Sequence, residues 1–250
     1  MVLASFNSRL QQQDISLFGV RSEKAVTFPF GLGVSGVHEL VEAVYGDMAA
    51  LTGAALALAG RPGVTLWAVQ RKVMSAHGNL LSEGARRFGS CGRSQQYLFV
   101  RASKPIDVLW AVNEGAQANV VNLIVAEVED VDFSVTRRLK LVSERHGVPV
   151  ILLMPHTREG ASACETRWRM SALPSAPNMY DSRAPGAPRW RAVLERCRLA
   201  PHRAGEIFDL EYDDETLSLR VVSQLAAGSV TAHAHVGVEQ TFECSIRNTG

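Results

Sequence analysis

The sequence predicts an α/β protein with a mostly parallel central sheet, helices on both faces and antiparallel strands at its C-terminal edge. Between residues 37 and 154, apolar segments alternate with helical ones, as they do in proteins with parallel sheets. The apolar segments are nearly continuous, which is typical of strands buried on both faces. After residue 164 the pattern becomes polar–apolar alternation, which favours antiparallel strands with one solvated face.

The elements of the parallel part follow in order along the chain. Strands are expected at residues 37–41, 64–69, 96–101, 120–128 and 148–154. Helices are expected at residues 47–59, 79–88, 105–118 and 133–146. The third begins with Pro105, which is tolerated in a first turn. The fourth is amphipathic, with Val135, Leu139 and Val142 on one face.

The C-terminal part contains shorter alternating segments at residues 165–171, 189–194, 206–212 and 216–222. A turn at Asp213-Asp214 predicts that the last two form a hairpin. Residues 173–188 are a Pro-, Ala- and Ser-containing loop, long enough to be either mobile or functional. The expected domains are an N-terminal arm or helix at 1–24, a core at 25–223 and a flexible tail at 224–250.

Composition excludes several classes of protein. Lys and Arg number 26 against 25 Asp and Glu, and the net charge of +1 argues against a histone-like protein. The four cysteines are too far apart for a zinc site, a redox pair or a disulfide framework. The N-terminus lacks a signal-peptide pattern, and the apolar segments are too short to span a bilayer. A cytoplasmic protein with no membrane contact is therefore expected.

A phosphate-binding loop is missing from the place where one would lie. Gly31–Gly36 matches GxGxxG, but no convincing strand, helix and acid surround it. After the strand at 37–41, only Gly46 of a phosphate loop remains, and no Lys lies between Lys24 and Lys72. Asp47 is expected to cap the next helix and, with Glu42, to repel a triphosphate. Glu42, Gly46, Asp47 and Glu127 are therefore predicted to mark a degenerate nucleotide site.

Metal and catalytic motifs are weak. Glu127, Glu129 and Asp130 end an apolar strand, where acids can hold magnesium beside bound ATP. Without a phosphate cradle, a relic or a partner-facing acidic patch is the favoured interpretation. His233 and His235 have no third ligand nearby. No catalytic residue, metal or cofactor is expected.

Two Arg-Trp-Arg segments allow two interpretations. Trp168 and Trp190 are expected on one face of their strands, with arginines on the other. In the first interpretation the tryptophans belong to the core and the arginines are solvated. In the second, the segments face DNA phosphates or an acidic partner. The residues concerned are Arg167, Trp168, Arg169, Arg189, Trp190 and Arg191.

Several of these segments together resemble the ImuA family, RecA-like proteins of a bacterial damage-inducible mutagenesis cassette. The resemblance covers roughly residues 28–222. The segments that carry it, in chain order, are Gly36–Leu40, Ala49–Leu58, Trp67, Val100–Ala111, Thr136–Leu141, Gly147–Pro149, Glu165–Arg169 and Gly186–Arg191.

The resemblance implies a RecA-like core without a working phosphate loop. It also implies action in SOS-induced, error-prone translesion DNA synthesis. The implied partners are ImuB, a catalytically inactive homologue of Y-family polymerases, and an error-prone DNA polymerase III alpha-type subunit. RecA, DNA and a second copy of the chain are further candidates, the last by fold analogy through residues 1–24.

Three functions remain open from the sequence. The first is a non-catalytic accessory protein of a translesion synthesis complex. The second is an ATPase with a non-standard nucleotide site near Gly46, Asp47 and Glu127. The third is a binder of single-stranded DNA or a modulator of RecA filaments, against which the weak net charge argues mildly.

Overall fold

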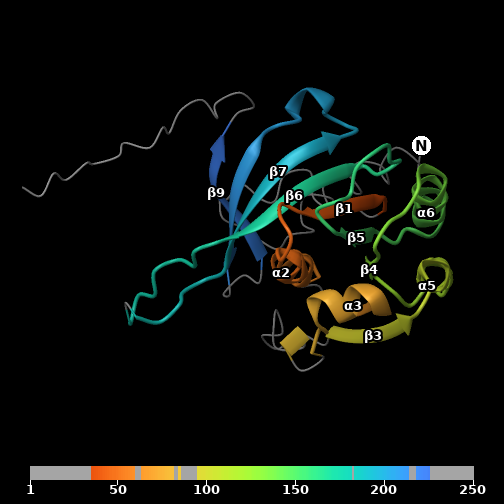
Figure 1. Ribbon diagram of the computed structural model, residues 1–250, viewed down its shortest axis with the longest axis horizontal. Coiled ribbons are helices and arrows are strands. Elements are labelled where there is room, and N and C mark those ends of the chain that lie inside the picture. The colour runs from red at the N-terminus through yellow and green to blue at the C-terminus, as the bar shows by residue number, and fades with distance from the viewer. Residues whose placement is uncertain are drawn as a thin grey trace, which may run out of the picture.

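The computed structural model contains one nine-stranded sheet of order β3-β2-β4-β5-β1-β6-β7-β8-β9 (Figure 1). It describes residues 35–59, 63–81, 84–85, 95–181, 183–213 and 218–225. The predicted arm, most of the glycine motif, and His233 and His235 lie outside the described residues. So does most of the predicted tail, whose first two residues belong to the last strand.

All five strands expected in the parallel part are present, and each pairs only in parallel with its neighbours. Their bounds are Val37–Glu42 (β1), Gly63–Gln70 (β2), Gln95–Ala102 (β3), Leu123–Glu127 (β4) and Val150–Met154 (β5). Because β5 lies between β1 and β4, the carboxyl ends of β1 and β4 lie at the same edge of the sheet, one strand apart. A ligand site in an α/β sheet is normally found at this edge.

Strand β6 (Thr166–Leu173) corrects one expectation. Its polar–apolar alternation favoured an antiparallel strand, but β6 pairs in parallel with β1 and antiparallel only with β7. The alternation has another cause, because one face of β6 packs in the core while Arg167 and Arg169 point to the opposite, polar face. The antiparallel edge therefore begins at β7.

The remaining strands form the expected antiparallel edge. They are β7 (Arg189–Cys197), β8 (Ile207–Asp213) and β9 (Ser218–Leu225), with a short 3-10 helix at Pro201–Arg203 before β8. β8 and β9 pair as the hairpin that the Asp213-Asp214 turn predicted.

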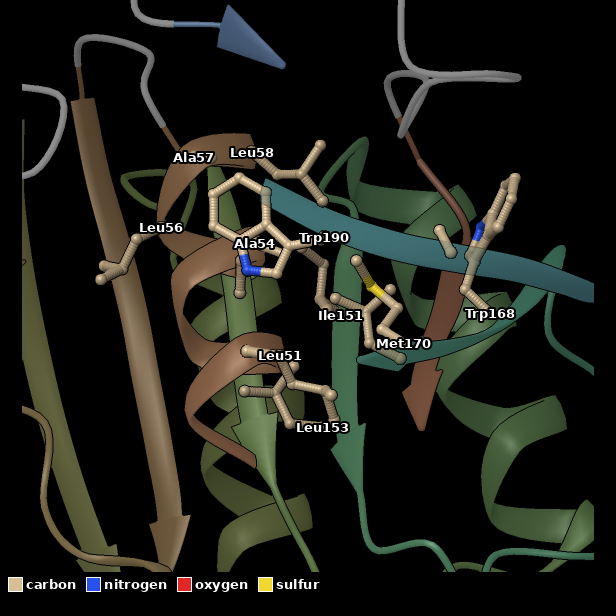
Figure 2. Close-up of a cluster of buried hydrophobic side chains, with 14 of the residues drawn as sticks. Leu51, Ala54, Leu56, Ala57, Leu58, Ile151, Leu153, Trp168, Met170 and Trp190 are labelled. Carbon is tan, nitrogen blue, oxygen red and sulfur yellow. The ribbon is translucent and has the colours of Figure 1, made fainter. Parts of the chain in front are cut away.

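Helices cover both faces of the sheet, as expected. α2 (Met48–Leu58) packs on one face, and α5 (Pro105–Gln117) and α6 (Phe133–His146) pack on the other (Figure 1). α2 is rich in small residues because Trp190 lies against it (Figure 2). A Cβ atom at Gly53 would lie 3.2 Å from Cζ2 of Trp190, so a larger side chain there would displace the indole.

The segment after β2 differs from its prediction. A helix is expected at residues 79–88; of the described residues in this range, 84 and 85 are helical and 79–81 are not. In addition, α3 (Arg71–His77), which the sequence did not predict, follows β2 directly and ends at Gly78, whose φ is +95°. α3 has two turns and Val73 as its buried residue, so its sequence carries no helical period long enough to detect. No helix in the described part of the chain is long and apolar enough to cross a membrane.

Candidate functional site

The loop from Ala43 to Asp47 joins β1 to α2 at the carboxyl edge of the sheet. Gly46 adopts a φ of +105°, which favours glycine and turns the chain toward the helix. The carboxylate of Glu42 is fully buried beneath this turn. Its Oε1 accepts the N–H of Gly46 at 3.3 Å, and its Oε2 accepts the N–H of His156 at 3.2 Å. Glu42 therefore occupies the underside of the loop.

Asp47 holds the other side of the same loop. Its Oδ2 accepts the N–H of Val44 at 3.1 Å. The expectation that its side chain caps α2 is wrong, because no hydrogen bond runs from the first turn of the helix to this carboxylate. The side chain turns back into the loop, and the backbone of Asp47 has a ψ of 2° instead of the extended geometry usual for a cap.

Four of the five backbone N–H groups of this loop are bonded within the protein. The N–H of Ala43 donates to the Met170 carbonyl at 2.9 Å, and that of Asp47 donates to the Val44 carbonyl at 3.2 Å. Those of Val44 and Gly46 donate to carboxylates. A phosphate-binding loop presents such groups to the ligand. Here these four groups already have acceptors within the protein, and Glu42 and Asp47 add two carboxylates.

Two histidines flank the buried carboxylate of Glu42. Nδ1 of His77 lies 3.7 Å from Oε1, and Nδ1 of His156 lies 3.6 Å from Oε2. The ring of Tyr45 lies 5.5 Å from that of His77 and 5.9 Å from that of His156, measured between centroids. Neither histidine was predicted from the sequence, because His77 ends α3, His156 follows β5, and neither belongs to a local motif. Among the described residues, no group of three or more His, Cys, Asp or Glu side chains is placed so that it could hold a metal ion.

Glu127 is the last residue of β4. Trp67 donates its indole N–H to Oε1 of Glu127 at 2.5 Å. Burial raises the pKa of the Glu127 carboxyl above its ordinary value, although this hydrogen bond acts in the opposite direction. Glu127 and His77 both line a cleft of about 440 Å³ beside the start of α2. The site positions thus form two groups, with Glu42, Gly46 and Asp47 in the loop and Glu127 in the cleft.

The neighbouring acids predicted with Glu127 do not converge on one point. Glu129 pairs with Lys72 at 2.5 Å, and Asp130 pairs with Arg158 at 3.2 Å. Glu129 and Asp130 therefore each have their own cation. Together with Glu127, they do not form a magnesium site in the described part of the chain.

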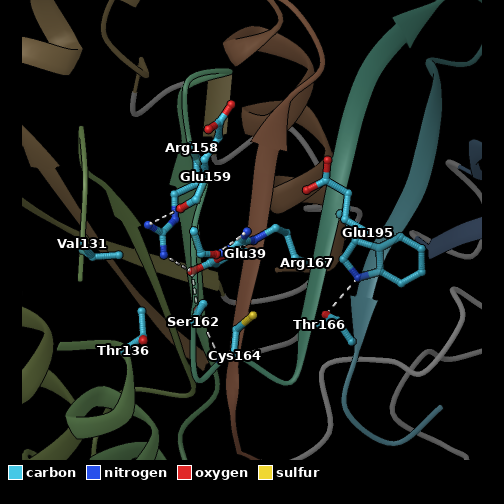
Figure 3. Close-up of polar contacts among 12 residues, drawn as sticks. Glu39, Val131, Thr136, Arg158, Glu159, Ser162, Cys164, Thr166, Arg167 and Glu195 are labelled. Atoms are coloured by element: carbon cyan, nitrogen blue, oxygen red, sulfur yellow. Dashed lines mark hydrogen bonds and ion pairs between the residues drawn. The ribbon is translucent and has the colours of Figure 1, made fainter. Parts of the chain in front are cut away.

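Arg167 belongs to a buried ionic network around Glu39 (Figure 3). Its Nε donates to Oε2 of Glu39 at 2.5 Å, and Nη2 of Arg158 lies 3.1 Å from Oε1. The hydroxyl of Ser162 donates to the same Oε1 at 2.7 Å. Burial alone would raise the pKa of Glu39, but the Ser162 hydrogen bond and the Arg167 and Arg158 charges together hold it below its ordinary value.

The other predicted arginines form ion pairs between neighbouring strands. Arg169 pairs with Glu195. Arg191 contacts both carboxylate oxygens of Asp209, at 2.8 and 3.0 Å. Arg189 pairs with Glu211 at 2.5 Å, and the same carboxylate also accepts from Arg220. The polar face of β6–β9 is therefore a ladder of alternating charges.

Both tryptophans lie in the core, as the first interpretation of the Arg-Trp-Arg segments expects. Trp168 is 1% exposed and Trp190 is 4% exposed. That interpretation also expected solvated arginines, which is wrong for Arg167 because this side chain is buried with Glu39. Arg169, Arg189 and Arg191 remain partly exposed. They are the members of the predicted partner- or DNA-facing set that solvent reaches.

Proteins similar to this chain are found among curated sequences and among solved structures. No protein-family model matches the chain. Two curated proteins named Protein ImuA, from Caulobacter vibrioides strains NA1000 / CB15N and ATCC 19089 / CIP 103742 / CB 15, are each 29% identical over 219 residues. Each alignment covers 81% of this chain and 86% of the relative.

Two solved structures are also similar. The RadB recombinase is 14% identical with a TM-score of 0.47, over 73% of this chain and 90% of that one. SulA from Pseudomonas aeruginosa is 16% identical with a TM-score of 0.37, over 48% of this chain and 97% of that one.

Sheet order, two-sided helix packing and the antiparallel edge define an α/β protein with a mostly parallel central sheet. Within that class the β1–α2 loop is closed by the chain's own side chains. The chain is ImuA-like, and the resemblance inferred from the sequence is confirmed by relatives that span most of its length.

Proposed function

We propose that this protein is a cytoplasmic, non-catalytic accessory factor of an SOS-induced, error-prone translesion DNA synthesis complex. Its direct partner in this proposal is ImuB. The error-prone DNA polymerase III alpha-type subunit, RecA and DNA are further candidate partners. The similarity to ImuA proteins supports the general role, and the partners and the absence of catalysis are part of this proposal.

The closed β1–α2 loop is the observation that carries the non-catalytic assignment. A triphosphate bound there would need the N–H groups of Val44 and Gly46, which Asp47 and Glu42 already occupy. It would also approach two carboxylates, one of them fully buried. Exchanging these internal bonds for phosphate contacts would leave the Glu42 carboxylate buried with fewer hydrogen bonds, which is costly.

Two measurements on the purified chain test this proposal. If ATP bound with magnesium at 100 times its dissociation constant, it would stabilise the fold by about 2.7 kcal/mol. For a chain of this size that gain raises the melting temperature by several degrees. We expect no such shift at millimolar Mg-ATP, together with co-purification of ImuB from the same host. A clear shift without an ImuB complex would contradict the proposal.

A second candidate function, a non-standard ATPase, has one observation in its favour. The cleft beside Glu127 and the start of α2 has room for part of a small ligand. If this cleft bound nucleotide, the substitution Glu127→Gln would alter Mg-ATP affinity, whereas Glu129→Gln, outside the cleft lining, would not. Equal absence of ATP binding by the wild type and both variants would exclude this function.

Direct binding of single-stranded DNA is less well supported. Arg169, Arg189 and Arg191 are each neutralised by a carboxylate on a neighbouring strand. Proteins that bind phosphates through free cations lose affinity steeply as salt rises. We therefore expect weak DNA binding with a shallow salt dependence. A steep salt slope that the triple replacement of these arginines by Gln removes would restore the DNA-facing interpretation.

A further inference from the structure

The segment between β6 and β7 extends away from the sheet (Figure 1). We call residues 174–188 the β6–β7 finger. Near its middle lie Met179, which is 86% exposed, and Tyr180, which is 93% exposed. These are the two most exposed large hydrophobic side chains among the described residues. Isolated surface hydrophobics are ordinary, but here two adjacent ones lie on a projecting segment.

The described residues of the finger form hydrogen bonds with one another. Oδ1 of Asn178 accepts the N–H of Tyr180 at 2.8 Å and that of Asp181 at 3.2 Å. At the base, the N–H of Gly186 donates to the Ala176 carbonyl at 3.0 Å. A Cβ atom at Gly186 would lie 2.3 Å from that carbonyl oxygen, so the two branches approach closely. The Met179–Tyr180 pair is therefore presented on a preformed support.

Such a support favours association with a protein surface. Tyr and Met are enriched in the buried centres of protein interfaces, where a few large side chains supply most of the affinity. A preformed loop loses less conformational entropy on binding. Tyr180 adds a hydroxyl group that can donate a hydrogen bond at the edge of an apolar pocket.

The charges on the finger argue against a nucleic acid as its ligand. Its described residues contain one acidic and one basic side chain, Asp181 and Arg183. The arginine at its base, Arg189, pairs with Glu211. Binding of single-stranded DNA combines stacking with a positively charged groove along the backbone, and these residues offer no excess of positive charge.

We propose that the β6–β7 finger inserts Met179 and Tyr180 into an apolar pocket of a folded protein partner. This inference rests on the proposed function, which makes that partner ImuB. The pocket is apolar, and it accepts a hydrogen bond from the Tyr180 hydroxyl at its rim. The finger and the closed loop are separate features, so each can be tested without disturbing the other.

The test measures affinity of the full-length chain for purified ImuB. The double substitution Met179→Ser, Tyr180→Ser is expected to weaken binding at least tenfold without lowering the melting temperature. Leu199→Ser is the matched control, because Leu199 is 79% exposed at another site, and its affinity is expected to equal that of the wild type. Asn178→Ala keeps both anchor side chains but removes their support, and a several-fold loss is expected.

Each other outcome has a defined meaning. If the wild-type chain binds ImuB and the double variant binds it with the same affinity, the proposed role of the finger is wrong and the proposed function stands. Absence of a wild-type complex overturns both. If the double substitution abolishes self-association or binding of a single-stranded oligonucleotide while ImuB binding persists, the finger serves that other ligand and the inference is wrong.

Discussion

Glu39 is a fully buried carboxylate on a central strand, balanced by two buried guanidinium groups. A buried charge that loses its partners is far more costly than a solvent-exposed one. The depressed pKa of Glu39 means that its contribution to stability is present above the ordinary carboxyl pKa of 4.5 and is lost as the pH falls through the lowered value. The network therefore stabilises the folded state at neutral pH.

Replacing Glu39 tests this interpretation. Glu39→Ala would leave Arg158 and Arg167 buried without their shared carboxylate, and we expect a loss of roughly 3–5 kcal/mol in the free energy of unfolding. Urea denaturation at pH 7 measures it. Asp130→Asn removes an exposed partner of the same Arg158 and should cost less than about 1 kcal/mol. Equal losses for both variants would show that the network does not depend on burial.

The contribution of Glu127 to stability changes with pH in the opposite direction to that of Glu39. Because burial raises its pKa, the folded state holds the proton more tightly than the unfolded state does. Its contribution to stability is present below 4.5 and is lost as the pH rises through the raised value. Glu127→Gln keeps an acceptor for Trp67 but no longer titrates. The free energy of unfolding should thus decline less in the variant from pH 4.5 upward, and parallel curves would contradict the shift.

Helix α6 is the element that sequence reasoning predicts best. Its bounds match the expected range, and Leu139 is buried on the face that was predicted to be apolar. Oδ1 of Asp132 accepts the N–H of Val135 at 2.7 Å, and Gly147 closes the helix in the left-handed region. Lys140 is buried as well because it pairs with Glu165, a contact that no helical period reveals.

The N-cap of α6 makes a testable contribution to stability. Asp132→Ala removes the acceptor for a backbone N–H group of the first turn, and the free energy of unfolding should fall by roughly 0.5–2 kcal/mol. Asp132→Asn retains an oxygen acceptor and should lose clearly less. Denaturant titration of the two variants measures the difference. Equal values for alanine and asparagine would mean that the cap contributes nothing.

Elements whose pattern reflects local packing were predictable, and contacts between distant segments were not. The five parallel strands followed from their apolar runs, and the β8–β9 hairpin from its turn. The strands with which β6 pairs depend on its position in the sheet. Its polar–apolar alternation does not indicate that position. Asp47 lies before α2 as predicted, but its carboxylate accepts a hydrogen bond from Val44 instead of from the first turn of the helix. Which donor it meets depends on the turn geometry at Gly46.

For the molecule as a whole, the sheet order brings the β1–α2 loop and the end of β4 to one edge, where open α/β sheets normally bind a ligand. Here the loop is bonded to Glu42 and Asp47, and the acids beyond Glu127 have separate cations. The sequence predicted that a degenerate nucleotide site is marked by Glu42, Gly46, Asp47 and Glu127, and all four lie at this edge of the sheet. It did not predict His77 and His156, because these approach Glu42 only after α3 and β5 have packed.

The most direct test is a binding isotherm of the full-length chain with ImuB, recorded with and without saturating Mg-ATP. Because the loop is already closed in the free protein, we expect a specific complex whose dissociation constant is the same in both titrations. A complex that forms only with Mg-ATP, or whose affinity changes tenfold on its addition, would contradict the proposed non-catalytic role. Such a result would mean that nucleotide binds and is coupled to the partner site.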